Sequence, residues 1–273
     1  MLDPASWTTL RRRARKLPGW LRSWAAHQRG RAKQRFDSLP QRIANFREGG
    51  IPIPPARLIY SATRMESVEW FLASGQAARE SIRETAAGVG IEIERLEAVL
   101  DFGCGPGRVM RHWQGLRGPA LFGSDYNRSS VEWCRRNLAF AEFRVNALGG
   151  PLAFDSEAFD LVYGLSVFTH LTEERQRYWM DELTRVVRPG GHLLITTHGK
   201  RHASELPGNE WDRFAAGELV VVRGDREGRN ECAAFHPESY VRANLARGLE
   251  VARFEAEGAR GNPWQDLYLL RKP

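Results

Sequence analysis

A short stretch in the middle of the chain combines acidic and glycine residues at a spacing that could hold a charged ligand. Residues 98–102 form an apolar run that contains Asp101 and stops at Gly103, and Gly105 and Gly107 follow at alternate positions. Such a run predicts a buried strand. Because glycine has no side chain, the backbone after the strand can turn tightly and approach a ligand closely. We therefore expect a ligand site here, with the Asp101 carboxylate beside it.

The spacing of this loop separates two classes of cofactor. A dinucleotide fingerprint needs G-x-G-x-x-G, but the third glycine position is occupied by Arg108. The Asp101 carboxylate would repel a pyrophosphate and attract an ammonium group. The loop therefore favours a cofactor that carries an amino acid and disfavours an NAD-dependent dehydrogenase.

A second acidic residue ends the next apolar run. Residues 120–124 predict a strand, and Asp125 follows it, 24 positions after Asp101. A carboxylate at this place can accept the hydrogen bonds of a ribose diol. The alternative is that Asp125 caps the helix expected from residue 129. Tyr126 follows immediately, where its ring could pack against an adenine.

Together these segments resemble the class I S-adenosylmethionine-dependent methyltransferases. The resemblance covers residues 90–273, and the last nine residues are similar to methyltransferases found among bacterial surface-glycan and glycosyltransferase genes. The segments that carry it are Asp101-Phe102-Gly103-Cys104-Gly105-Pro106-Gly107, Asp125, Phe159-Asp160-Leu161-Val162-Tyr163, Ser166-Val167-Phe168-Thr169-His170-Leu171 and Leu183-Thr184-Arg185-Val186-Val187-Arg188-Pro189-Gly190-Gly191.

The resemblance implies an α/β fold: a doubly wound, Rossmann-like sheet of seven mostly parallel strands with an antiparallel last strand. It implies S-adenosylmethionine as the cofactor, with Asp101 near the amino group and Asp125 on the ribose. Asn146 stands where the family often has an aspartate toward the adenine, so recognition of the base could use the Ala147 backbone. The cofactor-binding residues expected from the resemblance are Asp101, Phe102, Gly103, Cys104, Gly105, Asp125, Tyr126, Asn146, Ala147, Leu165 and Ser166.

The elements that must position these residues alternate along the chain, as expected for a parallel sheet covered on both faces. An insertion at residues 200–235 interrupts the alternation, and a hairpin is expected at 218–235, where it could serve as a lid. The strands are expected at 98–102, 120–124, 141–145, 159–164, 191–197, 249–255 and 265–270, and the helices at 67–87, 107–116, 129–139, 172–187 and 237–247.

Two histidines are candidates for the base that a hydroxyl acceptor would need. His198 follows the fifth expected strand and is preferred, and His170 follows the fourth and comes second. Both would lie at the carboxyl edge of the sheet, where ligands bind in such folds. The alternative for each is a hydrogen-bonded structural histidine. No cluster of carboxylates and histidines has metal-site spacing, so we predict no metal.

The net charge of +7 comes from one end of the 273-residue chain. Residues 1–50 contain 12 Arg or Lys and 3 Asp or Glu, whereas the remainder contains 28 and 30. We predict a basic, tryptophan-containing N-terminal extension at 1–50 and a methyltransferase domain at 51–273, after a proline-rich connector. The extension could be a solvated helical arm, or it could touch anionic lipid or nucleic acid. An organelle presequence is a further alternative.

Composition also excludes several classes of protein. The longest stretch without Asp, Glu, Lys or Arg is 12 residues, too short to span a membrane. No apolar segment typical of a cleaved signal is present near residue 1, and the three cysteines form no disulfide framework, which predicts a cytoplasmic protein with peripheral membrane contact as an option.

The function that these features predict is methyl transfer from S-adenosylmethionine to the hydroxyl of a small molecule or a glycan. The first alternative is a nucleic-acid methyltransferase that uses the basic arm to hold phosphates. The second is a non-catalytic module that binds the cofactor and recruits partners through the arm.

Overall fold

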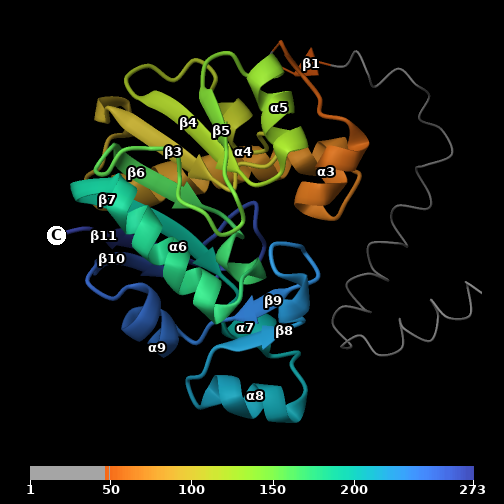
Figure 1. The fold of residues 1–273 in the computed structure, drawn as a ribbon, viewed down its shortest axis with the longest axis vertical. Helices are drawn as coiled ribbons and strands as arrows, with labels where there is room; N and C mark the ends of the chain where they lie inside the picture. The colour runs from red at the N-terminus through yellow and green to blue at the C-terminus, as the bar shows by residue number, and fades with distance from the viewer. Residues whose placement is uncertain (1–46, 49) are drawn as a thin grey trace, which may run out of the picture.

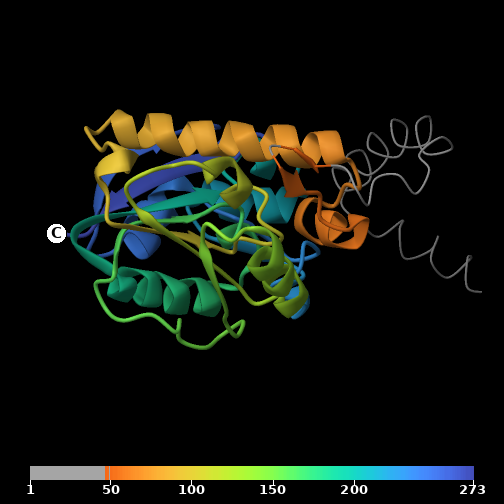
Figure 2. The same ribbon diagram turned by 90° about the horizontal axis from the view of Figure 1, so that it is seen from above.

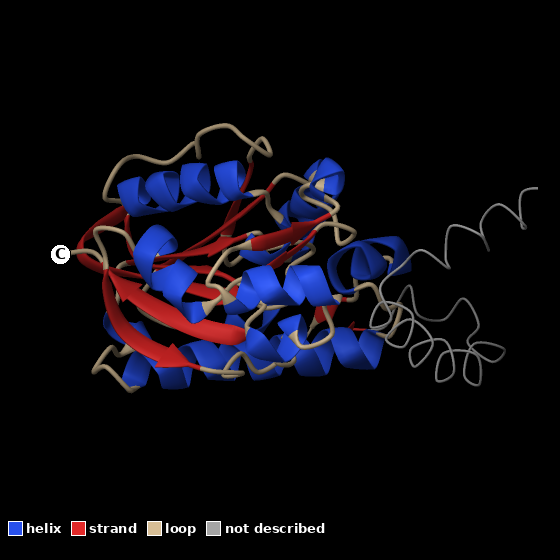
Figure 3. Cartoon of the chain, turned by 90° about the horizontal axis from the view of Figure 1, so that it is seen from below, coloured by secondary structure: helices blue, strands red, loops and turns tan. Residues whose placement is uncertain are grey.

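A computed structural model describes residues 47, 48 and 50–273, so nearly all of the expected basic extension lies outside the described residues. A twisted seven-stranded sheet lies between helices (Figures 1 and 3), in the order β10-β11-β7-β6-β3-β4-β5. Only β11 among these strands runs antiparallel to its neighbours, which confirms the expected fold class. The strands are β3 (Ala98–Phe102), β4 (Ala120–Asp125), β5 (Glu142–Val145), β6 (Phe159–Gly164), β7 (Val187–Thr197), β10 (Glu250–Glu255) and β11 (Asp266–Arg271).

Side chains alternate between the two faces of the sheet and build a core on each. On one face, Val99 joins apolar residues of α4 (Val68–Ala87). On the other face, Leu100 and Phe102 join those of α6 (Glu173–Val186). Figure 2 shows the long α4 along one side of the sheet and α6 along the opposite side. Burial on both faces explains why the strands are apolar throughout rather than alternating with polar residues.

Three helices begin at side chains that satisfy free N–H groups. Ser67 accepts a hydrogen bond from the Trp70 N–H at the start of α4, and Thr172 accepts one from Arg175 at the start of α6. α5 (Arg128–Asn137) begins after Asn127, whose side chain accepts a hydrogen bond from the Ser130 N–H. None of the helices in the described part of the chain has the length and apolarity needed to cross a bilayer.

The expected helix at 107–116 is wrong. The chain passes through successive turns and then forms only a short 3-10 helix, η4 (Met110–Trp113). Gly107 has φ +75°, which lies outside the right-handed helical region, so a helix cannot start at this residue. The expected helix at 237–247 also differs, because α9 (Glu238–Tyr240) continues as the π-helix η7 (Val241–Leu245).

The insertion at 200–235 forms a small layer of its own at the lower end of the view in Figure 1. The expected hairpin is present as the antiparallel pair β8 (Val220–Val222) and β9 (Ala233–Phe235). A bridge between His198 and Phe235 connects β9 to the end of β7. The other elements are β1 (Arg47–Glu48), β2 (Ile51–Pro52), α3 (Ala56–Thr63), η3 (Ile93–Arg95), η5 (Phe168–His170), α7 (Lys200–Ala203), α8 (Gly208–Ala215) and η6 (Gly224–Arg226).

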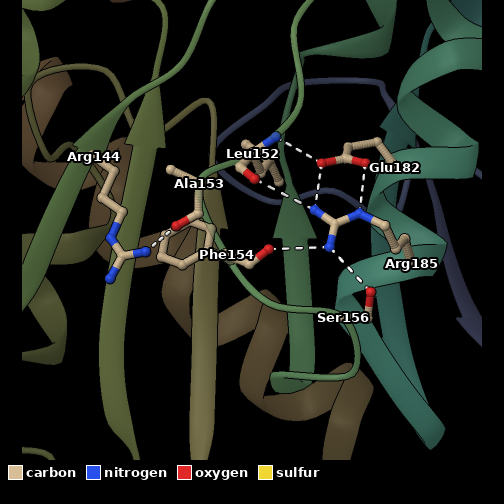
Figure 4. Close-up of polar contacts among 7 residues, drawn as sticks. All are labelled: Arg144, Leu152, Ala153, Phe154, Ser156, Glu182 and Arg185. Atoms are coloured by element: carbon tan, nitrogen blue, oxygen red, sulfur yellow. Dashed lines mark hydrogen bonds and ion pairs between the residues drawn. The ribbon is translucent and has the colours of Figure 1, made fainter.

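The loop after β5 is attached to α6 by a pair of charged residues (Figure 4). Glu182 accepts a hydrogen bond from the Leu152 N–H at 2.6 Å. Arg185, paired with Glu182, donates to the carbonyl of Phe154 at 3.0 Å and to the Ser156 hydroxyl at 3.2 Å. The pairing also lowers the pKa of Glu182, so its carboxylate stays charged at neutral pH. The loop is thereby held on the α6 side of the sheet.

Asp160 connects the amino ends of β6 and β3. Its carboxylate is 4% exposed and accepts hydrogen bonds from the Glu97 N–H at 2.7 Å and the Ala98 N–H at 2.8 Å. It also forms an ion pair with Arg188 at the start of β7. One side chain therefore joins three central strands at the edge opposite the candidate site.

Replacement of Asp160 by alanine should destabilise the fold by about 3 kcal/mol, because two buried N–H groups lose a charged acceptor. The free energy of unfolding, measured in urea by circular dichroism, tests this. Asp155→Ala is the matched control, since Asp155 is exposed and should change stability by no more than about 0.5 kcal/mol. Equal effects of the two substitutions would contradict the role given to Asp160.

Candidate active site at the carboxyl edge of the sheet

The strand order creates a crevice at the end of β3. This strand lies between β4 and β6, so the chain leaves β3 toward one side of the sheet and leaves β6 toward the other. In open α/β sheets, ligands bind where neighbouring connections diverge in this way. The residues that follow Phe102 and Gly164 therefore form the candidate site.

The glycine loop after β3 is shaped by close packing against the loop after β6. Gly103 has φ +76°, and a Cβ atom there would lie 2.4 Å from the Val167 Cγ2 atom. Gly105 has φ +51°, and its N–H donates a hydrogen bond to Asp125. Gly103 is required because a side chain there would clash with Val167. Glycine is also favoured at both positions because their φ angles are positive. The loop therefore leaves its backbone N–H and carbonyl groups close to any ligand in the crevice.

Asp101 is a buried carboxylate whose hydrogen bonding is incomplete. It is 4% exposed, and its Oδ2 atom has no hydrogen-bond partner among the described residues. Burial raises the pKa of Asp101 to about 7, although a hydrogen bond from Tyr163 and the positive charge of Arg108 both act to lower it. A cationic ligand group near Oδ2 would stabilise the ionised form. The predicted contact with an ammonium group therefore fits this environment.

Asp125 connects the glycine loop to the end of β4. Its Oδ2 atom accepts the Gly105 N–H at 2.8 Å, and its Oδ1 atom accepts the Asn127 N–H at 2.7 Å. Burial raises its pKa, and these two hydrogen bonds work against the rise. The capping alternative is wrong, because Asn127 caps α5. Each carboxylate oxygen keeps a further lone pair that could accept a hydroxyl.

Phe102 and Cys104, two of the residues expected to bind the cofactor, have side chains that are buried in the core. The Phe102 side chain lies in the core on the α6 side, 4.6 Å from the Trp179 ring. The buried Cys104 thiol lies 3.6 Å from the Gly105 carbonyl oxygen, and the Cys134 thiol lies 3.4 Å from the same atom. Any contact of Phe102 with a cofactor would therefore use its backbone.

The residues expected near the adenine lie at the ends of β4 and β5. Asn146 accepts a hydrogen bond from the Ser124 hydroxyl at 2.6 Å and donates one to the Ala147 carbonyl at 2.8 Å. Tyr126 is 46% exposed, and its hydroxyl donates to the Gly228 carbonyl in the insertion. Contact of these residues with an adenine stays a prediction.

Leu165 and Ser166 begin the loop after β6, as expected. Both are partly exposed, and Ser166 has φ +59°, a left-handed conformation that is uncommon for a residue other than glycine. The Ser166 N–H donates to the Thr196 hydroxyl at 2.8 Å, and Gln265 donates to the Ser166 hydroxyl at 2.8 Å. Three strand ends therefore meet at Ser166.

His170 and His198 are brought together, with ring centres 6.3 Å apart. His170 donates from Nδ1 to the Cys232 carbonyl at 2.8 Å, so a neutral ring leaves Nε2 as an acceptor. The Nδ1 atom of His198 has no partner in the described part of the chain. Burial lowers the pKa of His170 and lowers that of His198 well below 6.5. Both rings are therefore neutral near pH 7 and able to accept a proton.

Sequence reasoning missed two further histidines of this cluster. His202 stacks on His198 with ring centres 4.2 Å apart, and burial lowers its pKa to about 4. His236 donates from Nε2 to the Gln176 side-chain oxygen at 3.0 Å and has a pKa lowered to about 3 by burial. Both lie in the insertion or directly after it. His202 lies only four positions after His198, which was a local signal of contact, whereas His236 is 38 positions away.

The segment 227–232 between η6 and β9 crosses the candidate site and is held at several points. Tyr126 and His170 hydrogen-bond to the backbone of Gly228, and Asn230 donates to the Ser61 carbonyl of α3 at 2.8 Å. Glu231 pairs with Arg64, which also lies over the Tyr60 ring. The insertion, for which a lid role is predicted, is therefore connected to α3 and to the turn after β4.

Other features lie apart from this edge. In the part of the chain that the structure describes, no group of three or more His, Cys, Asp or Glu side chains is arranged to hold a metal ion. A cavity of about 260 Å³ lies between α4 and the β10–β11 connection, lined by charged side chains such as Glu84 and Arg253. It touches neither the glycine loop nor the histidines.

Residues 100–195 match the family of methyltransferase domains. The matched region contains the glycine loop, Asp125 and the loop after β6, which are the parts of the crevice described above. Residues 100–195 are therefore similar to methyltransferase domains, whose cofactor is S-adenosylmethionine.

Curated relatives and solved structures agree with this assignment. The chain is 35% identical over 135 residues to a fatty-acid O-methyltransferase of Mycolicibacterium smegmatis, covering 48% of this chain and 46% of the relative. It is 30% identical over 155 residues to phthiotriol/phenolphthiotriol dimycocerosates methyltransferase 1 of Mycobacterium ulcerans, covering 56% and 50%. The chain thus spans about half the length of these relatives.

A crystal structure of an S-adenosylmethionine-dependent methyltransferase from Mesorhizobium loti shares the fold. Its TM-score is 0.54 at 18% identity, covering 70% of this chain and 98% of the other. The architecture is therefore the Rossmann-like fold of class I methyltransferases.

Proposed function

We propose that the whole chain is an S-adenosylmethionine-dependent methyltransferase that acts on a hydroxyl oxygen of a small molecule or a glycan. The observation that carries this proposal is the pair of buried carboxylates, Asp101 and Asp125, at the crevice beside the glycine loop. Asp101 has one oxygen without a hydrogen-bond partner among the described residues, and Asp125 accepts a hydrogen bond from Gly105 of the loop. The methyltransferase domain at 100–195 supports the same reaction.

The cofactor supplies an electrophilic methyl group on a sulfonium, so the protein contributes mainly by positioning the reacting groups. Asp101 would hold the ammonium group through its Oδ2 atom. Asp125 would accept hydrogen bonds from the ribose hydroxyls, and Gly103 and Gly105 would let the chain approach the methionine portion. Leu165 and Ser166 would face the cofactor from the other side of the crevice.

Asp125→Ala should weaken binding of S-adenosylhomocysteine by about 1–3 kcal/mol, because the ribose loses a charged acceptor. Isothermal titration calorimetry measures the affinity. Asp155→Ala, at an exposed position, is the control and should bind as the wild type does. An unchanged affinity of Asp125→Ala would reject the ribose role.

His198 is the proposed base for a hydroxyl acceptor, with His170 as the second candidate. A hydroxyl must lose its proton as the methyl group arrives, and a neutral imidazole can take it. The Nδ1 atom of His198 is the stronger candidate because no described residue occupies it, whereas Nδ1 of His170 is engaged by the Cys232 carbonyl. An acceptor carboxylate, as in a fatty acid, would need no base.

His198→Ala should lower turnover at least about 100-fold, the size usual for loss of general base catalysis, and leave cofactor affinity nearly unchanged. Because burial lowers the pKa of His198 well below 6.5, the wild type should keep its activity as the pH falls through 6.5 and lose it only at more acidic pH. Steady-state rates between pH 5 and 8 test both points.

His192→Ala is the control, because His192 lies in the middle of β7, six positions before His198. Full turnover of His198→Ala at neutral pH would exclude it as the base and leave His170→Ala as the next variant. Full turnover of both variants would favour a carboxylate acceptor over a hydroxyl.

Two observations bear on the chemical class of the methyl acceptor, and they favour different classes. The last nine residues resemble methyltransferases of surface-glycan gene clusters. Two of the curated relatives are named for lipid substrates, a fatty acid and a dimycocerosate, whereas others are named as tRNA methyltransferases. Both substrate types fit an enzyme that works near a membrane surface, which gives the basic segment 1–50 a role in binding anionic lipid. The slightly negative remainder of the chain favours this over the nucleic-acid alternative.

Replacement of Arg11, Arg12 and Arg13 by glutamate should abolish co-sedimentation with vesicles that contain anionic lipid, because attraction to the surface falls by about 1 kcal/mol for each basic residue lost. Affinity for S-adenosylhomocysteine should not change. Vesicles of neutral lipid and a duplex DNA probe are the controls. If the wild type ignores anionic vesicles and binds DNA in a salt-dependent manner, the nucleic-acid alternative replaces the membrane role.

A further inference from the structure

Ser166 occupies a backbone conformation that needs support from its surroundings. Its φ of +59° places it in the left-handed region, where a residue with a Cβ atom is disfavoured. Such strain persists only where neighbouring groups hold it, and it is common at ligand sites. The turn that contains Ser166 also carries Val167, whose methyl group packs against Gly103 of the cofactor loop. The conformation of Ser166 therefore sets how the two loops of the crevice meet.

A closed ring of hydrogen bonds holds this conformation. The Ser166 N–H donates to the Thr196 hydroxyl at 2.8 Å, and that hydroxyl donates to the Gln265 side-chain oxygen at 2.7 Å. The Gln265 amide nitrogen then donates to the Ser166 hydroxyl at 2.8 Å. Thr196 is 0% exposed and Gln265 5% exposed, so water cannot replace a missing member at low cost.

The ring depends on the antiparallel last strand. Asp266 at the start of β11 pairs with Thr197 at the end of β7, so Gln265 stands just beyond the carboxyl edge of the parallel strands. β7 in turn pairs with β6, with Ile195 opposite Gly164. Gln265 is thereby placed beside Ser166 across 99 positions of sequence. The Gln265 carbonyl also accepts the Ala259 N–H at 3.1 Å, so its backbone is held independently of its side chain.

We propose that Gln265 is a positioning residue for the cofactor: together with Thr196 it holds Ser166 in the left-handed conformation that shapes the cofactor side of the crevice. It acts through Ser166 and not by contact with the cofactor. This inference rests on the proposed function, because it assumes that the crevice binds the S-adenosyl cofactor.

The test compares binding of S-adenosylhomocysteine to variants of the full chain by isothermal titration calorimetry. Gln265→Ala should lower the affinity about tenfold, because Ser166 is freed to leave the strained conformation. Ser166→Gly supplies the reference affinity for the double variant, since glycine adopts this conformation without strain. The double variant Gln265→Ala with Ser166→Gly should bind S-adenosylhomocysteine with the same affinity as Ser166→Gly alone.

An undiminished effect of Gln265→Ala in the Ser166→Gly background would overturn the proposal, because a direct contact or a general loss of stability would persist there. An unchanged affinity of Gln265→Ala alone would also overturn it.

If Gln265→Ala fails to fold, a second pair of variants, in which the side chains keep nearly the same shape, tests the proposal. Thr196→Val removes a member of the ring and should weaken binding by a similar factor. Thr197→Val is the matched control on the same strand, because Thr197 is equally buried and its hydroxyl has no partner among the described residues. Equal affinities of these two variants would count against the ring. Failure of the wild type to bind S-adenosylhomocysteine would instead reject the proposed function.

Discussion

The hydrogen bond from the Gly105 N–H to the Asp125 carboxylate joins the ends of two neighbouring parallel strands, and the candidate site depends on it. It fixes the glycine loop against the end of β4 and keeps a buried carboxylate beside the crevice. The bond is possible because β3 and β4 end at the same edge of the sheet. Gly105 can present its N–H in this direction because its φ is positive. A carboxylate that is partly satisfied by the fold itself costs less to bury than an isolated one.

The edge of the sheet is divided into two electrostatic environments. Asp101 and Asp125 place two buried carboxyl groups on the side of the glycine loop, and burial raises the pKa of both, so a cationic ligand there would favour their ionised forms. The side beyond β7 contains His170, His198 and His202, all kept neutral near pH 7 by burial. Neutral imidazoles do not repel a positively charged sulfonium nearby, and they remain able to accept a proton. This division suits a reaction in which a methyl group moves from a cation to a hydroxyl.

The last strand and the insertion complete the crevice with residues from distant parts of the sequence. β11 brings Gln265 to Ser166, and β9 connects to β7 beside His198. The segment 227–232 attaches to α3 and to the turn after β4. The walls of the site are therefore contributed by four separate regions of the chain, and the central strands provide their common support.

Local pattern in the sequence determined the sheet and the cofactor loop. Buried parallel strands are short apolar runs, and the turns that follow them need glycine or an acidic residue, so β3, β4 and β6 with Gly103, Asp101 and Asp125 could be read directly. The helix expected at 107–116 failed because a positive φ at Gly107 is a backbone state that composition does not reveal.

Only the tertiary structure decided which side chains meet. The ring through Thr196 and Gln265 and the attachments of Gly228 join residues whose separation along the chain carries no periodic signal. Whether a histidine is neutral also depends on burial by several elements at once, which no short segment specifies. The sequence thus determined which strands end in the residues of the candidate site, and the packing of the insertion and the last strand determined what surrounds them.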